Sequence, residues 1–351
     1  MSFDTLSALE HMAMADRENV QTGLLAWILG AHSPLHVERK AAILGQLTGL
    51  PLSDVRSTSS KTEDGNIDLV VTCHLADDTA TCIAIENKLK AAESAHQLQK
   101  YDEHLKGRRV HAKVFLSLLG ELPRGGIGWI GASYSKLHDA LAATGPKEDV
   151  TEDPYVRDAR AMLQRLVTAV SLVTSEPRFA RYVFSRGPRA RPADESAFAY
   201  YVKTLRLERL LQRAWCIQLA RMVGPLGPGW TTSTSTGARS ASALLDIARV
   251  VGAEGQKVRV GLQLQGLVLK AFCHPHPYPR KVTNEQRKLV ADQLEVMRTA
   301  LSLGAKHKIS HSRDRGFRSF ALSKHSADFT NAEVWTVEIR KHFVQLEKTD
   351  W

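Results

Sequence analysis

Two acidic residues, a lysine and a glutamine–tyrosine pair have the types and the spacing of a reactive site. Asp68 interrupts one apolar run, and Glu86 ends the next apolar run 18 positions later. Lys88 follows Glu86 by two positions, and Gln97 and Tyr101 follow at a mutual separation of four. An unpaired carboxylate near a protein core is energetically costly, so acidic interruptions of apolar segments indicate chemistry rather than packing.

This combination suits the hydrolysis of a phosphodiester. The reaction needs neutralisation of the phosphate charge and a hydroxide-like nucleophile in line with the leaving oxygen, and a divalent metal supplies both. Mg²⁺ prefers oxygen ligands and keeps several waters, so Asp68, Glu86 and the backbone carbonyl of Asn87 are enough to hold it, with Mn²⁺ as a substitute. The ammonium of Lys88 can orient the attacking water, lower its pKa or stabilise the transition-state charge.

The elements around these residues are predicted to bring them together. Ile67–Cys73 and Ala80–Glu86 are rich in apolar and β-branched residues and are predicted as neighbouring strands joined by a tight hairpin turn. Lys88 is one strand period from Glu86, so both side chains are expected on the same side of the sheet. Gln97 and Tyr101 share one face of a predicted helix over Ala91–Leu105.

The remaining elements of the first half complete an α/β pattern. The chain is predicted to form helices, three strands, a helix and further strands, an order typical of a central sheet flanked by helices. The further segments are a helix capped by Asp16 and ending near Gly30, a helix over Val37–Leu47, a weak strand over Val55–Ser59, and strands over Val110–Leu119 and Ile127–Tyr134.

The site residues also match a known pattern. A helical glutamate, then Asp68, then Glu86-x-Lys88 after a hairpin, resembles the PD-(D/E)XK nuclease superfamily over roughly residues 10 to 175. The spacing of Gln97 and Tyr101 is similar to the recombination-exonuclease branch of that superfamily. Ile67 stands where many members have proline. The resemblance implies a restriction-endonuclease-like core with the order αβββαβ and a mixed sheet.

The resemblance also implies a role for each residue. The metal ligands would be Asp68 and Glu86, with Glu18 as an outer ligand, and Lys88 would be the catalytic base or the water-orienting group. Gln97 would help to position the site, and Tyr101 would steady it or contact a phosphate. Structural alternatives exist: an ion pair between Asp68 and Lys88, a core role for Tyr101 within an apolar stripe, and a helix-dipole role for Glu18.

The second half is predicted as a separate α+β domain. We predict a nuclease domain over residues 1–180, a basic Pro/Gly linker over 181–194, and a domain over 195–351. The expected elements of the chain from residue 155 onwards are helices over Tyr155–Val173, Glu195–Val223 and Asn284–Leu303, a hairpin of Gln256–Gln265 with Leu267–Cys273, and a strand over Val334–Ile339.

The two halves of the chain differ in net charge, although the total of +10 does not show it. Residues 1–150 contain 15 Lys and Arg against 19 Asp and Glu, whereas residues 151–351 contain 32 against 18. A polyanion would therefore meet the second half first, and we expect that domain to bind nucleic acid or to sense a signal. The alternative is that the basic surface only aids solubility.

The composition argues against membrane and disulfide-rich classes. Hydrophobic residues make up 43% of the chain, and no apolar run approaches the ~20 residues of a bilayer span. No signal segment is evident, so a cytoplasmic location without membrane contact is expected. The four cysteines show no CxxC spacing. Cys273-His274-Pro275-His276 is a weak alternative zinc motif, because no second pair lies at ligand spacing.

The leading hypothesis is a magnesium-dependent deoxyribonuclease, an endonuclease that acts on DNA. Bacterial proteins of this kind often belong to antiphage defence systems, so the resemblance also leaves a homo-oligomer or a partner subunit of such a system open. One alternative is a catalytically silent nucleic-acid-binding or assembly subunit with a nuclease-like fold. Another is a nuclease for RNA, including tRNA, because the site acts on the phosphate and does not itself recognise the 2′-OH.

Overall fold

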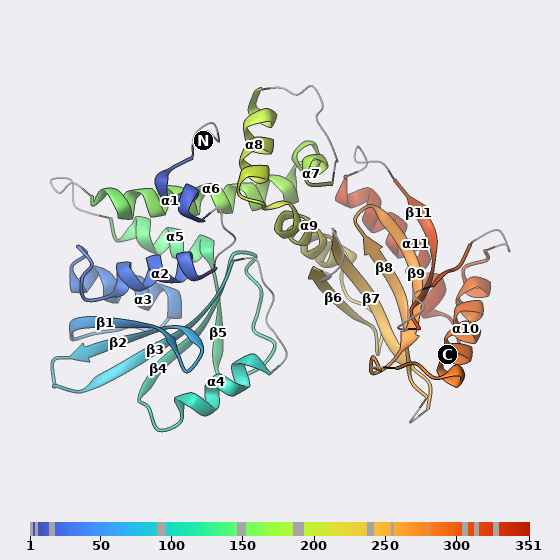
Figure 1. The fold of residues 1–351 in the computed structure, drawn as a ribbon, viewed down its shortest axis with the longest axis horizontal. Helices are drawn as coiled ribbons and strands as arrows, with labels where there is room; N and C mark the ends of the chain where they lie inside the picture. Colours follow the sequence, from blue (N-terminus) through green and yellow to red (C-terminus); the bar gives the residue numbers. More distant parts are fainter. Residues whose placement is uncertain are drawn as a thin grey trace. The chain divides into compact units, whose positions relative to one another are not determined.

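The chain divides into two compact units, each with its own sheet (Figure 1). The computed structural model describes residues 3, 6–13, 18–89, 96–145, 152–184, 193–236, 242–253, 256–279, 281–303, 308–311, 316–325 and 330–351. The first unit comprises Met1–Val170 with Ser196–Arg206, and the second comprises Ser171–Glu195 with Leu207–Trp351.

The first unit contains a five-stranded mixed sheet in the order β1-β2-β3-β4-β5. Strands β1, β2 and β3 pair antiparallel, whereas β4 runs parallel to β3 and β5 runs parallel to β4. The strands are β1 (Val55–Asp64), β2 (Ile67–Leu75), β3 (Ala80–Lys88), β4 (Val110–Ser117) and β5 (Trp129–Ser133). This mixed α/β architecture confirms the predicted fold class of the first half.

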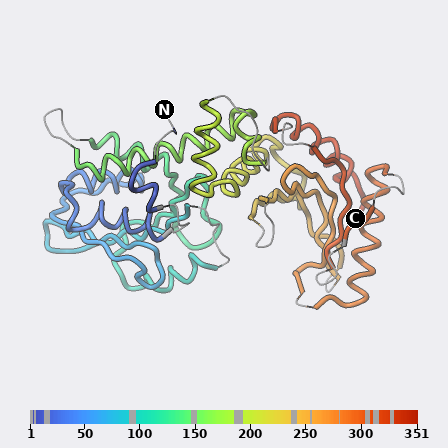
Figure 2. Tube along the Cα trace, turned by 45° about the horizontal axis from the view of Figure 1, so that its top comes forward, coloured from blue at the N-terminus to red at the C-terminus, as the bar shows by residue number. Residues whose placement is uncertain are grey.

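Helices cover both faces of this sheet (Figures 1 and 2). Helices α2, α3 and α5 pack on one face, and α4 packs on the other. The bounds of the helices are α1 (Ala8–Ala13), α2 (Glu18–Leu29), α3 (Val37–Thr48), α4 (Gln97–Leu105), α5 (Tyr134–Ala143) and α6 (Pro154–Ser175). The predicted Asp16 cap and residues 91–95 of the helix predicted over Ala91–Leu105 lie outside the described residues.

The β1–β2 turn fixes the position of Asp68. Asp64 pairs with Ile67, so Gly65 and Asn66 form a two-residue turn, and both have positive φ angles of 64° and 66°. Two consecutive positive φ angles are typical of a two-residue hairpin turn, in which asparagine and glycine are the preferred residues. A Cβ on Gly65 would also lie 2.2 Å from the ring of His104, so a larger residue here would displace that ring.

An apolar cluster joins α4 to its face of the sheet. Burial of a large apolar side chain contributes roughly 1.5–3 kcal/mol, so the cluster fixes where α4 lies and therefore where Gln97 and Tyr101 project. The buried members are Ile67, Val70, Cys82, Ala84, Leu98, Tyr101, Leu105, Phe115 and Trp129.

The second unit contains an antiparallel six-stranded sheet in the order β10-β11-β9-β8-β7-β6. The strands are β6 (Thr231–Thr236), β7 (Ala243–Val251), β8 (Val258–Gln265), β9 (Val268–Pro275), β10 (Ser310–His311) and β11 (Arg318–Lys324). Helices α9 (Glu208–Val223), α10 (Asn284–Ala300) and α11 (Ala332–Glu347) pack against the sheet, and α11 contacts both α9 and α10. The predicted β8–β9 hairpin and the α+β class are confirmed.

Two predicted elements of the second half are wrong. Val334–Ile339 is part of α11 and not a strand, because Trp335 and Ile339 are buried at helical spacing while Val337 between them is 69% exposed. The helix predicted over Glu195–Val223 is two helices, α8 (Ala193–Thr204) and α9. Arg206 adopts a left-handed backbone conformation with φ 51°, which interrupts the helical hydrogen bonding.

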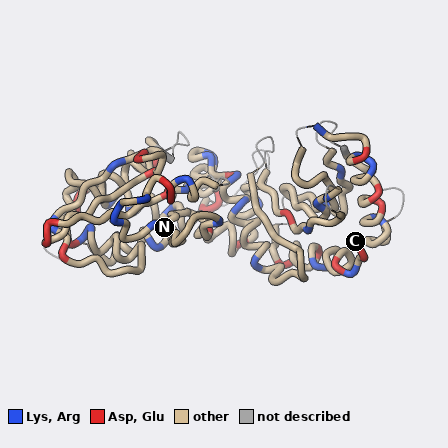
Figure 3. Tube along the Cα trace, turned by 90° about the horizontal axis from the view of Figure 1, so that it is seen from below, with Lys and Arg blue, Asp and Glu red and all other residues tan. Residues whose placement is uncertain are grey.

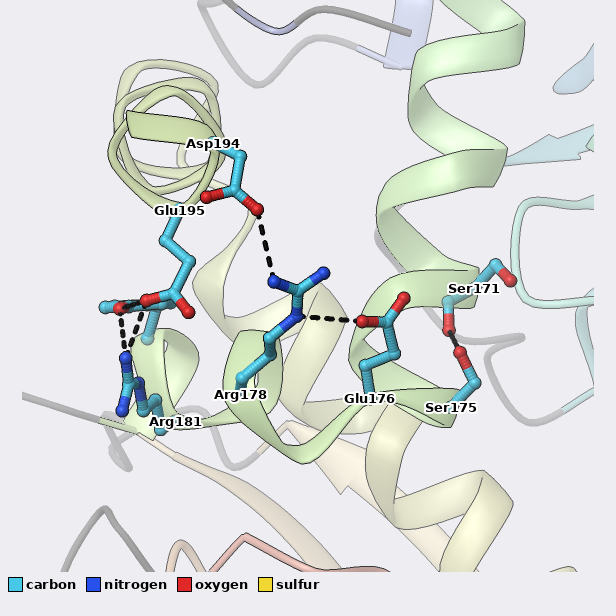
Figure 4. A network of polar contacts seen from close by, with 8 residues as sticks. Ser171, Ser175, Glu176, Arg178, Arg181, Asp194 and Glu195 are labelled. Atoms are coloured by element: carbon cyan, nitrogen blue, oxygen red, sulfur yellow. Dashed lines mark hydrogen bonds and ion pairs between the residues drawn. The ribbon is translucent and has the colours of Figure 1, made fainter. Parts of the chain in front are cut away.

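Helix α7 (Pro177–Phe184) and the start of α8 occupy the two ends of the predicted linker. Its central residues, 185–192, lie outside the described part of the chain. Arg178 donates to Glu176 at 2.9 Å and to Asp194 at 3.2 Å (Figure 4). Arg181 donates to Glu195 at 2.6 Å. These contacts tie α7 to the beginning of α8.

None of the helices among the described residues is both long and apolar enough to span a bilayer. All four cysteines are buried and unbridged. Cys273 and His274 are adjacent on β9, and successive strand residues point to opposite faces, so they cannot share a metal. The alternative zinc motif is therefore not supported.

Candidate active site

Asp68 and Glu86 lie side by side on neighbouring strands. Leu69 of β2 faces Ile85 of β3 in the antiparallel register, so Asp68 and Glu86 are the next residues on each strand beyond that pair. The Asp68 carboxylate accepts a hydrogen bond of 2.8 Å from the backbone N–H of Asn87. Glu86 is fully buried, whereas the side chain of Asp68 is 26% exposed. Solvent therefore reaches the pair from the Asp68 side.

Lys88 lies beside both carboxylates. Its Nζ is 2.5 Å from Oε1 of Glu86 and 3.8 Å from Oδ2 of Asp68. The side chain is 9% exposed, so its charge is only weakly screened by water. The arrangement places one ammonium against two carboxylates, with the excess negative charge that a cation site requires.

Helix α4 brings Gln97 and Tyr101 to the same place. Nε2 of Gln97 donates to Oε1 of Glu86 at 2.7 Å and to the hydroxyl of Tyr101 at 2.7 Å. The ring of Tyr101 is packed in the apolar cluster, and burial raises the pKa of its hydroxyl to about 12. Tyr101 is therefore neutral at physiological pH, and it serves the core and the site together.

Asn87 supports the strand from the opposite face of the sheet. Its side chain is fully buried, where Nδ2 donates to Thr22 of α2 at 3.1 Å and Oδ1 accepts from Tyr134 of α5 at 2.7 Å. The side chain is thus committed to packing, so only the backbone carbonyl of Asn87 remains for the predicted ligand role.

Glu18 begins α2, but its side chain lies outside the described part of the structure. Thr22, four residues later in the same helix, contacts Asn87 of β3. Helix α2 therefore packs against the strand that carries the site. The outer-ligand role of Glu18 stays a prediction.

The environment of Glu86 disfavours its negative charge. Burial and, to a smaller extent, the negative charge of Asp68 raise the pKa of Glu86 to about 7, even though the ammonium of Lys88 acts in the opposite direction. Each added positive charge near this carboxylate would restore its ionised form. A cation shared with Asp68 is one means of doing so.

Two further acidic residues, Asp102 and Asp64, hold α4 in place, and neither was predicted from the sequence. Asp102 of α4 accepts hydrogen bonds from Lys113 at 2.7 Å, from the backbone of Ile127 at 2.7 Å and from the indole of Trp129 at 2.9 Å. Asp64, at the β1–β2 turn, pairs with Arg108 at 2.5 Å just beyond α4. Nothing in the sequence around these two residues indicates a special role. Their role depends on partners from segments that are distant in the sequence.

Comparison with protein-family models matches the part of the chain that carries this site. Residues 3–124 match the family model of the PD-(D/E)XK nuclease superfamily. The matched PD-(D/E)XK segment includes Asp68, Glu86, Lys88, Gln97 and Tyr101, and it ends before β5. Comparison with curated proteins and comparison with solved structures gave no match.

The predicted resemblance is therefore confirmed at the level of the PD-(D/E)XK superfamily, while the recombination-exonuclease branch stays a prediction. The match supports a nuclease, that is, a hydrolase of phosphodiester bonds with a nucleic-acid substrate. PD-(D/E)XK nucleases typically use divalent metal ions.

The donor set of this site fits a hard divalent cation. Oε2 of Glu86 is buried and has no hydrogen-bond partner among the described residues, although buried polar atoms normally have one. Asp68 lies next to it and is open to solvent. The described residues include no cluster of three or more His, Cys, Asp or Glu suited to a metal. Two carboxylates with water ligands suit Mg²⁺ better than zinc.

The raised pKa of Glu86 predicts a pH dependence of stability in the metal-free protein. A carboxyl group whose pKa is higher folded than unfolded stabilises the fold at low pH, and that contribution is lost as pH rises through the folded pKa. Relative to Glu86→Gln, the unfolding free energy of the wild type in EDTA should therefore fall between pH 5 and pH 8, by on the order of 3 kcal/mol. Urea denaturation measures it, and parallel pH profiles for both proteins would contradict the assignment.

Removal of the Gln97 side chain should weaken activity without unfolding the protein. Gln97→Ala deletes two hydrogen bonds that orient Glu86 and Tyr101, and loss of such supporting contacts typically costs 10–100-fold in metal affinity or activity. Gln99→Ala is the matched control, because Gln99 is an exposed glutamine on the same helix. Cleavage rates measured against Mg²⁺ concentration test this, and equal rates for the two variants would contradict a supporting role for Gln97.

Proposed function

We propose that this chain is a Mg²⁺-dependent nuclease that cleaves DNA, with Mn²⁺ able to replace Mg²⁺. The observation that carries the proposal is the convergence of Asp68, Glu86 and Lys88 on one side of the sheet, with Lys88 Nζ within 4 Å of both carboxylates. Such a group of charges, within the segment that matches the superfamily, is suited to phosphodiester hydrolysis.

In the proposed site, Asp68, Glu86 and the backbone carbonyl of Asn87 would hold the metal, with Glu18 as an outer ligand. The bound metal would supply charge neutralisation at the phosphate and a water of lowered pKa. Asp68 is the partly exposed member of the set, so substrate would approach from its side.

Lys88 is proposed to orient the attacking water through its ammonium or, as the neutral amine, to accept a proton from that water. Its ammonium is held against Glu86 in the described structure, within reach of the same space as both carboxylates. Gln97 fixes the orientation of Glu86, and the neutral hydroxyl of Tyr101 steadies Gln97 or donates to a phosphate oxygen. Each of these roles is carried by a side chain with an observed contact inside the site.

We propose that the nuclease domain comprises residues 1–180 and that residues 181–194 are a linker. Residues 195–351 would form a basic domain that binds nucleic acid or senses a signal. An endonuclease of bacterial antiphage defence in the cytoplasm, alone, as a homo-oligomer or with a partner subunit, is the proposed setting. The resemblance to bacterial nucleases and the charge of the second half support this setting.

Parallel digestion of supercoiled plasmid, linear duplex DNA and an RNA of matched sequence tests the proposal. We expect cleavage of the circular DNA with Mg²⁺ or Mn²⁺ and none in EDTA, because a circle has no ends for an exonuclease. Cleavage of the RNA without cleavage of either DNA would show that the substrate is RNA and not DNA. Absence of cleavage of all three substrates with either metal would overturn the nuclease proposal.

A further inference from the structure

The described helices that pack on the sheet of the second unit, α9, α10 and α11, lie on one face of it. In β8, Val258, Val260, Leu262 and Leu264 are all 0–1% exposed, as expected for side chains packed under α9, α10 and α11. The alternate residues, including Arg259 and Gln263, point to the other side. We call this second side the open face. Its polar residues include Asp246, Arg259, Gln263 and Lys270.

Basic and imidazole side chains collect at one end of the open face. Arg259 of β8 lies opposite His274 of β9 in the antiparallel register. The backbone N–H of His276 donates to the carbonyl of Lys257 at 2.9 Å, which extends the pairing beyond both strands. By strand alternation, Lys257, Arg259, His274 and His276 therefore lie on the same face. Lys257 and His276 are exposed.

Aromatic rings are stacked at this end of the sheet. The rings of Phe317, Phe272 and His274 are nearly parallel, with interplanar angles of 10° and 17° between neighbours. The ring of Tyr278 lies 4.4 Å from that of His274, at 31°. Phe272 is fully buried, whereas Tyr278 is 46% exposed. Burial lowers the pKa of His274 to about 4, so its ring is neutral within the stack.

Few acidic groups oppose the positive charge here. Asp246 is the neighbouring carboxylate on the open face, where it accepts from Gln263 at 2.9 Å and lies 3.9 Å from Arg259. No acidic residue that the structure describes forms an ion pair with Lys257. Basic residues occur throughout the second unit (Figure 3), and residues 151–351 contain 32 Lys and Arg against 18 Asp and Glu. A polyanion is therefore the complementary partner.

We propose that the open face around Tyr278 binds single-stranded nucleic acid, with an unpaired base stacked on Tyr278 and the adjoining phosphates bound by Lys257 and Arg259. Exposed aromatic rings beside a basic track are the elements with which proteins hold unpaired strands. A duplex hides the faces of its bases inside the helical stack, so only an unpaired strand can use the exposed tyrosine. The tyrosine therefore favours a single strand over duplex DNA.

This site is separate from the proposed nuclease chemistry and does not require hydrolysis. It deepens the proposed function by naming the form of substrate that the second unit would hold, an unpaired strand. The binding experiment is performed in EDTA, where no metal-dependent cleavage occurs. Failure of binding and failure of cleavage are therefore observed independently.

Fluorescence anisotropy with labelled 15-nucleotide probes tests the proposal on the full chain. The probes are single-stranded DNA, single-stranded RNA of matched sequence and the corresponding DNA duplex. We expect the wild type to bind one or both single strands more tightly than the duplex. Tyr278→Ala should weaken that binding about tenfold, whereas Tyr278→Phe should stay within about twofold, because the stacking ring is retained. Lys257→Gln should weaken binding and reduce its dependence on salt.

Two control variants define the outcome. Tyr200→Ala removes an exposed tyrosine of α8, and Lys341→Gln removes an exposed lysine of α11, which packs on the other face of the sheet. Neither should change binding. Equal affinity of wild type and Tyr278→Ala for single strands would overturn the site, with thermal unfolding used to confirm that each variant is folded. Preferential binding of the duplex, or no binding of any probe, would also overturn it.

Discussion

Asp68→Asn is expected to lower the rate of plasmid cleavage by on the order of 10²–10³-fold, the loss typical when one preorganised electrostatic group is removed from an active site. The amide keeps the size of the side chain, and its oxygen can still accept the hydrogen bond from the N–H of Asn87. What is lost is one of the two negative charges proposed to hold the metal. Initial rates at a fixed Mg²⁺ concentration measure the effect.

The matched control for this variant is Asp78→Asn. Asp78 is an exposed aspartate in the turn between β2 and β3, and its side chain pairs with Arg56 rather than with the site. Its cleavage rate should equal that of the wild type. If Asp68→Asn and Asp78→Asn cleave equally well, the carboxylate of Asp68 has no part in the reaction.

Lys88→Met should have an effect of similar size, about 10²-fold or more, which is the range for loss of a positioned group that manages a proton. Methionine keeps most of the length of the side chain and removes the ammonium that lies 2.5 Å from Glu86. Single-turnover cleavage rates across a pH series measure the effect, because loss of a proton-handling group changes the pH profile as well as the maximum rate.

Lys106→Met is the control for lysine removal, because Lys106 is an exposed residue just after α4 whose side chain pairs with Glu103. We expect no change in its rate or its pH profile. A Lys88→Met enzyme with the rate and pH profile of the wild type would show that Lys88 only balances the buried charge of Glu86.

The sequence predicted most of the first unit because its signals are local. Apolar β-branched runs with a turn between them define β2 and β3, and Lys88 is one strand period from Glu86, so the shared face follows from alternation alone. Gln97 and Tyr101 are one helical turn apart. The roles of Asp64 and Asp102 could not be predicted in this way, because each depends on partners from other elements.

The errors in the second half also have physical causes. The segment Val334–Ile339 satisfies a strand alternation over six residues, and only the wider spacing of Trp335, Ile339 and Leu346 indicates a helix. Neither Gly nor Pro lies between α8 and α9. The chain bends there because Leu205 and Leu207 are both buried, with Arg206 between them in a left-handed conformation. Tertiary packing, and not the local helix propensity, therefore determines where α8 ends.

The open face of the second sheet could not be predicted from sequence either. Lys257, His276 and Tyr278 are separated along the chain, and only the register of β8 with β9 places the first two side by side. The buried aromatic side chains of the second unit include Trp215, Trp230, Phe272 and Trp335. The exposed ring belongs instead to a loop tyrosine.

Equilibrium binding of Mn²⁺, followed by electron paramagnetic resonance without nucleic acid, tests most directly whether Asp68 and Glu86 hold one divalent cation. We expect the wild type to bind Mn²⁺ at a site from which Mg²⁺ displaces it. Asp68→Asn and Glu86→Gln should each lose this binding, whereas Asp78→Asn should retain it. Equal binding of Mn²⁺ by all four proteins, or none by the folded wild type, would contradict the metal-dependent site.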